Sequence, residues 1–397
     1  MAVEFFFLSL TILVGYFSLF LFEKTRISQV ILLMAFGFLL GPALGLLDVS
    51  QESIVVSLLP FLSTLALIVL LFSGGLEFDI LAVAGAIPKS MAFTFLVFGL
   101  GMALVGGLAY FALGWPIMHG ILLGAVAGET SSAIVIAMVE RARIEKATKS
   151  ILIVESTLTD ALCIIVSIVI IQLILAQQQL GVGQVAGILI SSFSIALLLG
   201  MVAAAFVLFL LGRFRVKRYV YVLMLAAIFG LYALTEFVEG NGAFGVFTFS
   251  VCIGSSGRLA KALKLGWNDP MDDELKKLLA EDRDEITFFV RTFFFSYMGL
   301  LVSVGFFEPY IIAVTVGIVA AFAISRIVAR RIVLPGLPVK DSRIVASMLP
   351  RGLATAVLAT LPLSSGIDIP GFQGLVIGVV LVSNIVATIG IFLFDRN

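Results

Sequence analysis

The sequence GETSS at residues 128–132 interrupts an apolar stretch over 116–138 that is long enough to cross a bilayer. A second apolar stretch, over 341–362, is interrupted by LPRG at residues 349–352, where proline removes a backbone donor and glycine loosens a helix. Backbone polar groups that are freed at membrane depth persist only where they line a cavity or meet protein partners. Both stretches are therefore predicted to be transmembrane helices that break in the middle.

Hydropathy divides the whole chain into about 13 apolar spans of membrane-crossing length. They lie at 3–22, 28–47, 54–76, 90–113, 116–138, 150–175, 184–212, 219–235, 240–256, 285–305, 308–329, 341–362 and 372–394. The two interrupted spans are an odd number of spans apart, so they cross the membrane in opposite directions. Such paired interruptions are typical of inverted-repeat transporters, although two independently kinked helices would give the same pattern. The predicted fold is an all-α polytopic membrane protein, an inverted repeat with two broken, crossing helices.

Composition and charge agree with a multi-pass membrane protein. Hydrophobic residues make up 61% of the chain and charged residues 13%, against about 45–50% and 25% in soluble proteins. All but three of the 25 Lys and Arg residues fall in alternate connections, and cytoplasmic loops collect positive charge. We therefore expect a cell-membrane protein with its N-terminus outside and its C-terminus in the cytoplasm. Because the basic residues are divided among short loops, we expect no nucleic-acid partner.

The span over 150–175 carries the polar sequence ESTLTD at residues 155–160. On a helix, Ser156, Thr159 and Asp160 share one face. Asp160 lies roughly 15 Å into the span at about 1.5 Å rise per residue. Acids at that depth are functional by default, and carboxylate and hydroxyl oxygens suit an alkali cation.

Other charged residues in or near the spans each have two interpretations. For Glu155 we favour a structural ion pair with Arg351 over direct proton transport. Arg291 either pairs with an acid or extends to the interface. Glu77 is interfacial or guards a cytoplasmic funnel, and Glu129 is an acid at the edge of the site or a partner for an arginine.

These motifs resemble the monovalent cation/proton antiporters, and are closest to the NhaP-type sodium/proton exchangers. The family's ES-x-x-N-D motif falls on residues 155–160, with Thr159 in place of Asn. Its T-D-P element falls on residues 130–132, with Ser131 and Ser132 in place of Asp and Pro. The SSAIV sequence at 131–135 instead resembles that of the related branch that includes potassium-efflux antiporters. GLEFD at 75–79 and RGLA at 351–354 extend the resemblance over most of the chain.

The resemblance implies an NhaA/NhaP-like antiporter fold, a homodimer and no cofactor. It implies that Asp160 binds both the proton and the cation, with Thr130 and Ser156 as further ligands of Na⁺ or K⁺. The full set of expected binding residues is Asp160, Thr130, Ser156, Thr159 and Ser131, with Glu155 and Arg351 as a stabilising pair.

One membrane transport domain is expected over 1–397. The scaffold is predicted in 1–86 and 219–305, the mobile core in 87–175 and 308–394, and a cytoplasmic loop at 257–284, where 275–285 favours a short amphipathic helix or a solvated linker.

The predicted activity is exchange of Na⁺, or Li⁺, for H⁺ by alternating access, electroneutral at 1:1 because Asp160 is the single exchanging carboxylate. The alternatives are a K⁺/H⁺ antiporter of the potassium-efflux type and a cation channel. An intramembrane aspartyl protease would need a second Asp at membrane depth, and a serine protease a His near a Ser, where His119 is the sole histidine. The sequence therefore favours a transporter over an enzyme.

Overall fold

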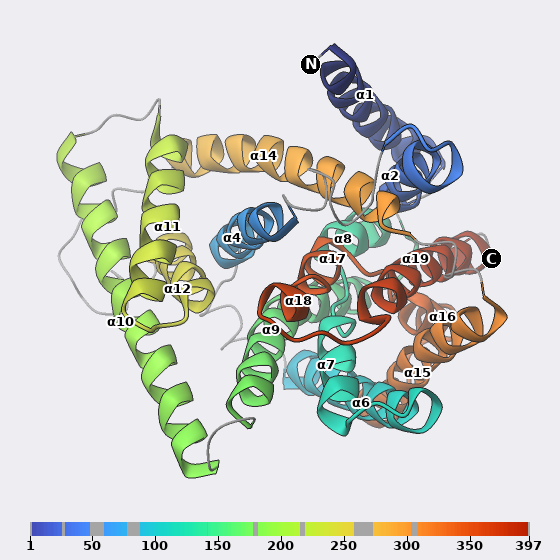
Figure 1. The fold of residues 1–397 in the computed structure, drawn as a ribbon. Helices are drawn as coiled ribbons and strands as arrows, with labels where there is room; N and C mark the ends of the chain where they lie inside the picture. Colours follow the sequence, from blue (N-terminus) through green and yellow to red (C-terminus); the bar gives the residue numbers. More distant parts are fainter. Residues whose placement is uncertain are drawn as a thin grey trace. The chain divides into compact units, whose positions relative to one another are not determined.

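The computed structural model describes residues 2–25, 28–47, 59–77, 88–140, 142–177, 182–214, 219–257, 273–302 and 308–395. The regular elements in these ranges are all helical (Figure 1). In chain order they are α1 (Ala2–Thr25), α2 (Gln29–Phe38), the π-helix η1 (Leu39–Ala43), α4 (Leu59–Glu77), α6 (Pro88–Leu113), α7 (Ile117–Val126), α8 (Ser132–Glu140), α9 (Lys146–Gln177), α10 (Val182–Phe214), α11 (Val220–Phe237), α12 (Gly242–Gly254), α14 (Asp273–Leu300), α15 (Pro309–Val333), α16 (Val339–Ser347), α17 (Leu353–Leu358), α18 (Leu361–Ser364) and α19 (Phe372–Asp395).

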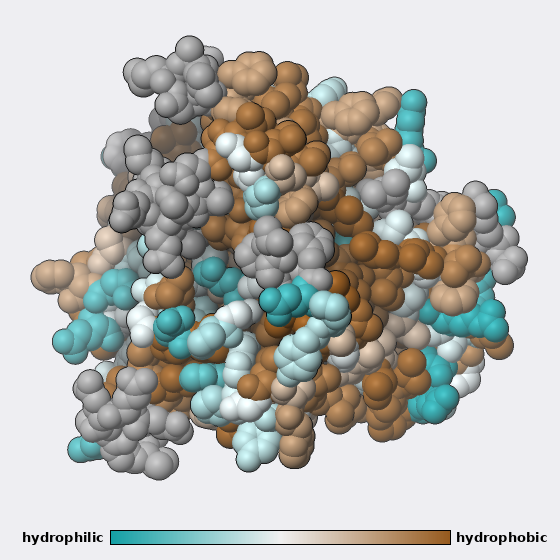
Figure 2. Space-filling view, turned by 45° about the vertical axis from the view of Figure 1, so that its right-hand side comes forward, coloured by the Kyte–Doolittle hydropathy of each residue, from teal (hydrophilic) through white to brown (hydrophobic). Residues whose placement is uncertain are grey.

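The helices have the length and the surface of membrane spans. Within the described ranges, six helices are long and apolar enough to cross a bilayer, namely those over Pro88–Leu113, Lys146–Ala176, Gly187–Arg213, Val220–Phe237, Pro309–Val333 and Phe372–Phe394. Large areas of the surface in Figure 2 are hydrophobic. Phe111 and Phe237, for example, are each 86% exposed, which suits side chains that face lipid. The prediction of an all-helical membrane protein is confirmed.

The described helices fall into two compact units. The first comprises Met1–Ser63, Ala86–Ile171 and Arg291–Asn397, and the second Thr64–Gly85 and Gln172–Val290. In the first unit α6 packs against α7 and α15, and α19 packs against α15 and α16 (Figure 1). In the second unit α10, α11 and α12 pack against one another.

The structure differs from the sequence prediction at the start of α14. A loop was expected over 257–284, with a short amphipathic helix or a solvated linker at 275–285 and a new span beginning at 285. The helix at 275–285 is present, but it is not separate from the span. Instead one helix runs without interruption over Asp273–Leu300. The physical reason is that neither proline nor glycine occurs between residues 273 and 298, so nothing stops the polar first turns from joining the apolar part. Residues 258–272 lie outside the described ranges.

Both predicted helix breaks are present. The first broken helix consists of α7, which ends at Val126, and α8, which begins at Ser132. The second consists of α16, which ends at Ser347, and α17, which begins at Leu353. The two breaks meet, because the backbone amide of Ser131 donates a hydrogen bond of 2.9 Å to the carbonyl of Pro350.

Gly352 makes this close approach possible. A Cβ atom built at Gly352 would lie 2.3 Å from Ser131 Oγ and 2.7 Å from Glu129 Oε1. Both distances are shorter than any tolerable contact, and Ser131 Cβ at 2.6 Å leaves the serine side chain no simple way to move aside. The glycine in the second break is therefore required by space.

We expect Gly352→Ala to separate the two breaks and to lower the stability of the folded protein by about 1–3 kcal/mol, the usual cost of overpacking. Gly374→Ala in α19 is the matched control, because a Cβ atom there has nothing within 4 Å and alanine favours a helix. The measurement is the midpoint of thermal unfolding in detergent. Equal midpoints for the two variants would show that the breaks do not need this contact.

Candidate functional site: the crossing of the two broken helices

The first break leaves backbone groups outside the helical hydrogen-bond pattern, and side chains bind them. The guanidinium group of Arg351 donates to the carbonyl oxygens of Gly128, at 3.5 Å, and of Glu129. The amide of Thr130 donates to Thr159 Oγ1 on α9 at 3.1 Å. The break is thus held from both sides, by the second broken helix and by α9.

The second break is held by α19. The amide of Arg351 donates to Ser383 Oγ at 3.3 Å, and the carbonyl of Arg351 accepts from Asn384 Nδ2 at 2.8 Å. The other end of the Asn384 side chain accepts from Ser28 Oγ at 2.7 Å. Ser383 and Asn384 are both fully buried. The polar pair in an otherwise apolar helix therefore serves to bind freed backbone groups.

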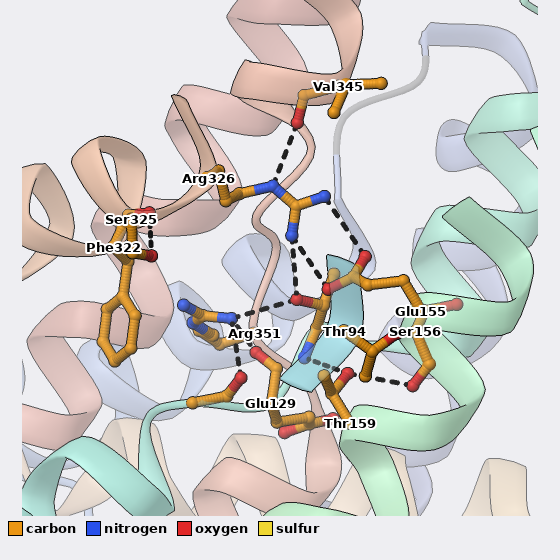
Figure 3. A network of polar contacts seen from close by, with 12 residues as sticks. Thr94, Glu129, Glu155, Ser156, Thr159, Phe322, Ser325, Arg326, Val345 and Arg351 are labelled. Atoms are coloured by element: carbon orange, nitrogen blue, oxygen red, sulfur yellow. Dashed lines mark hydrogen bonds and ion pairs between the residues drawn. The ribbon is translucent and has the colours of Figure 1, made fainter. Parts of the chain in front are cut away.

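Glu155 forms a buried, bidentate ion pair with Arg326 of α15 (Figure 3). The guanidinium nitrogens donate to Glu155 Oε1 at 2.9 Å and to Oε2 at 3.1 Å. Arg326 Nε donates to the carbonyl of Val345 in α16 at 2.9 Å. The two charged side chains are 1% and 0% exposed. The pair therefore joins three helices, α9, α15 and α16, in the interior of the first unit.

The predicted pairing of Glu155 with Arg351 is wrong. Arg351 turns toward the carbonyl oxygens of the first break, and its guanidinium lies 4.2 Å from the centre of the Phe322 ring. Arg326 lies inside α15 and not in a connection between spans, where all but three of the basic residues were expected. Its position within the apolar stretch 308–329 was the signal that could have identified it.

Glu129 binds the beginning of α17. Its Oε2 atom accepts hydrogen bonds from the amide of Gly352 at 3.3 Å, and from the amide and hydroxyl of Thr355, each at 2.5 Å. The side chain is 2% exposed. A carboxylate at this position satisfies amides of the first helical turn that have no partner within the helix.

Asp160 lies on the other side of the first break. Its Oδ2 atom accepts a hydrogen bond of 2.5 Å from Ser132 Oγ, at the first residue of α8. Asp160 is less buried than Glu129 and Glu155. One partner of this carboxylate is a neutral hydroxyl, whereas both oxygens of Glu155 bind a guanidinium, and Glu129 binds backbone amides and a hydroxyl.

The remaining predicted binding residues gather around the same crossing. Thr130 Oγ1 accepts from both Arg326 and Arg351, at 3.3 Å each. Ser156 Oγ donates to the carbonyl of Ile153 at 3.0 Å, and Thr159 Oγ1 donates to the carbonyl of Ser156 at 3.1 Å.

Two expected accessory residues lie elsewhere along the chain. Glu77 is the last residue of α4, and Arg291 lies half-buried in α14. The roles expected for them stay predictions. Five further residues at the crossing were not expected from the sequence to have functional roles, namely Arg326, Ser132, Thr355, Ser383 and Asn384.

The family sequence profile described as "Sodium/hydrogen exchanger, transmembrane" matches residues 9–394. The chain belongs to this exchanger family. The exchanger is also 24% identical, over 354 residues, to the "Probable Na(+)/H(+) antiporter 2" of Methanocaldococcus jannaschii. That alignment covers 85% of this chain and 79% of the relative.

Solved structures show the same fold. The structure of the sodium proton antiporter MjNhaP1 from Methanocaldococcus jannaschii at pH 8 aligns with this exchanger at a TM-score of 0.76 and 19% identity, covering 100% of this chain and 96% of that one. An electron-microscopy structure of MjNhaP1 aligns at 0.72 and 20% identity, with the same coverage. The predicted exchanger family is confirmed by the profile match, so the protein is a membrane transporter, and its fold is that of MjNhaP1.

The exchanger's stability should depend on the Glu155–Arg326 pair. Arg326→Met leaves the Glu155 charge buried without its partner, which typically costs about 3–5 kcal/mol. The double variant Arg326→Met/Glu155→Leu removes both charges and should unfold at a higher temperature than the single variant. The measurement is the thermal unfolding midpoint in detergent. A single variant as stable as the parent protein would contradict a buried, charged pair.

Proposed function

We propose that this protein exchanges one Na⁺ for one H⁺ across the cell membrane, with Asp160 as the carboxylate that holds either ion, and that Li⁺ is a further substrate. The family assignment supports sodium/proton exchange. The observation that carries the choice of Asp160 is its exposure, which is greater than that of Glu129 and Glu155 at the same crossing.

A transport carboxylate must lose and regain its charge in every cycle. Neutralising Glu155 would leave Arg326 as a buried charge without its counter-charge, at a typical cost of about 3–5 kcal/mol. Protonating Glu129 would disturb three hydrogen bonds at the start of α17. Asp160 interacts with the hydroxyl of Ser132, which can rotate to offer a lone pair in place of its proton. Of these acids, Asp160 is also the least buried, so it is the one that a proton or a cation reaches most readily.

Exchange then follows from competition for one carboxylate. Desolvation disfavours a bare charge, so Asp160 is occupied either by a proton or by a cation. Each half-cycle moves one positive charge, and the complete cycle is electroneutral at 1:1. The proposed further ligands are Thr130, Ser156, Thr159 and Ser131, together with Ser132. Thr130 joins them only when its hydroxyl leaves the two guanidinium groups.

The proposed transport movement is alternating access within an inverted repeat of about 13 spans. Spans in 87–175 and 308–394 form the moving core, and spans in 1–86 and 219–305 form the scaffold and the interface of a homodimer. The asymmetry of Lys and Arg places the N-terminus outside and the C-terminus in the cytoplasm. Labelling of an added cysteine near Lys149 by an impermeant reagent tests the orientation, and cross-linking tests the dimer.

A second candidate for the transported cation is K⁺. The SSAIV sequence at 131–135 is similar to that of potassium-efflux antiporters, which favours K⁺/H⁺ exchange as the alternative. Proton movement driven by gradients of Na⁺, Li⁺ and K⁺ in proteoliposomes distinguishes the two. A large net current in the same vesicles would indicate the less favoured cation channel.

We expect Asp160→Asn to abolish cation-driven proton movement in proteoliposomes, because an amide can neither release a proton nor neutralise a cation. The variant keeps the size of the side chain and should remain folded, with an unfolding midpoint close to that of the parent protein. Asp368→Asn, at an exposed position outside the crossing, is the matched control and should retain exchange. Substantial exchange by Asp160→Asn would rule out this residue as the carrier.

A further inference from the structure

We propose that Glu129 is a positioning residue, which fixes the segment 129–132 beside Asp160 and does not itself carry a proton through the transport cycle. The inference rests on the proposed function, because it concerns the placement of groups around Asp160. The sequence alone left the role of Glu129 open. The contacts of its carboxylate, of its backbone and of the residues that follow it point to this role.

The first step is the attachment of Glu129 to the second broken helix. Its Oε2 atom accepts from two amides and one hydroxyl, contributed by Gly352 and Thr355. We call Glu129, Gly352 and Thr355 together the Glu129 clasp. Because lipid offers no alternative donors or acceptors, the amides at the start of α17 depend on this carboxylate. The absence of a side chain at Gly352 leaves room for the carboxylate, since a Cβ atom there would lie 2.7 Å from Glu129 Oε1.

The second step is a reciprocal contact in the opposite direction. Arg351, from the second break, donates to the carbonyl oxygens of Gly128 and Glu129, just after α7 ends (Figure 3). An acid from the first break thus binds amides at the start of α17, and a base from the second break binds carbonyls just beyond the end of α7. Residue 129 takes part in both contacts, through its side chain and its backbone.

The third step connects the clasp to the transport carboxylate. Directly after Glu129, the amide of Thr130 donates to Thr159 on α9. Two residues later, Ser132 Oγ donates to Asp160 on α9. Four consecutive residues are therefore bound alternately to the second broken helix and to α9. Release of Glu129 from α17 frees one end of this short segment and shifts the hydroxyl groups that face Asp160.

The same geometry argues against Glu129 as a second proton carrier. Three donors converge on one oxygen of a side chain that is 2% exposed. Taking up and releasing a proton in every cycle would disturb these three hydrogen bonds each time. A proton carrier must also be reached by solvent from both sides of the membrane. The hydrogen bonds of the Glu129 clasp instead hold the Glu129 carboxylate inside the crossing.

The test compares Glu129→Gln with two variants of the clasp threonine in proteoliposomes. Glu129→Gln keeps the shape of the side chain and removes its charge. Thr355→Val removes the hydroxyl donor, and Thr355→Ser keeps it as the matched control. We expect Glu129→Gln to raise the KM for Na⁺ about tenfold, the order of loss that follows from loosening a positioned group, while the maximal rate stays within about threefold of the parent. Thr355→Val should raise KM in the same direction, and Thr355→Ser should behave as the parent protein.

A potassium diffusion potential set with valinomycin supplies the second readout. Exchange by Glu129→Gln should be as insensitive to voltage as exchange by the parent protein. An unchanged KM in both Glu129→Gln and Thr355→Val, or a change in voltage sensitivity in Glu129→Gln, would overturn the proposal. If Glu129→Gln does not fold, the comparison of Thr355→Val with Thr355→Ser decides it through KM alone. Transport by Asp160→Asn would instead show that the proposed function itself is at fault.

Discussion

Every backbone group released where the two helices break needs a partner inside the protein, because the hydrocarbon of a bilayer offers none. The structure meets this constraint almost entirely at one place. The amide of Ser131 donates a hydrogen bond to the carbonyl of Pro350. The Arg351 side chain donates to a carbonyl of the first break, and the Asn384 side chain donates to the carbonyl of Arg351. The breaks are therefore stable only when they lie against each other. This mutual dependence brings four helical segments and their charged side chains to a single crossing.

The same constraint sorts the charges at the crossing into fixed and exchangeable groups. Arg326 and Glu155 neutralise each other in a bidentate pair, and Arg351 and Glu129 each serve the break opposite their own. Charges engaged in this way hold the architecture and are costly to alter. Asp160 stands at the edge of this network, against a hydroxyl and less buried than the other two acids. Under the proposed function, the engaged charges form a rigid frame and Asp160 is the group whose occupancy changes.

The sequence predicted the features that depend on local composition. Long apolar stretches predicted the helices, and the polar residues at 128–132 and 349–352 predicted the breaks, because such residues cannot continue a lipid-facing helix without compensation. The polar face of 155–160 singled out Asp160 for the same reason, and its role as the carrier stays a prediction. The motif resemblance identified the family, which the profile match then confirmed.

What could not be predicted depends on which helix lies beside which. Arg326 is followed by Arg330 and Arg331, so its sequence context is that of the basic end of a span. Only the packing of α15 against α16 and α9 shows that Arg326 reaches Glu155. Whether Glu155 pairs with Arg326 or with Arg351 depends on the direction in which each arginine side chain points. Arg351 points to backbone carbonyls, so Glu155 pairs with Arg326. The roles of Glu129 and Asn384 likewise follow from contacts with segments more than 30 residues away. The start of α14 was missed because its polar first turns suggested a separate short helix or a linker, whereas no proline or glycine divides them from the apolar part.

If one carboxylate holds either one proton or one cation, each cation that binds must release one proton, and the number of protons released can be counted. Calorimetric titration of the purified protein with Na⁺, in buffers of different ionisation enthalpy and at a pH where the empty site is protonated, gives the number of protons released per ion bound. The account predicts one proton per Na⁺ for the parent protein. Release of two protons per ion, or binding of Na⁺ under these conditions with no proton released, would contradict a single shared carboxylate.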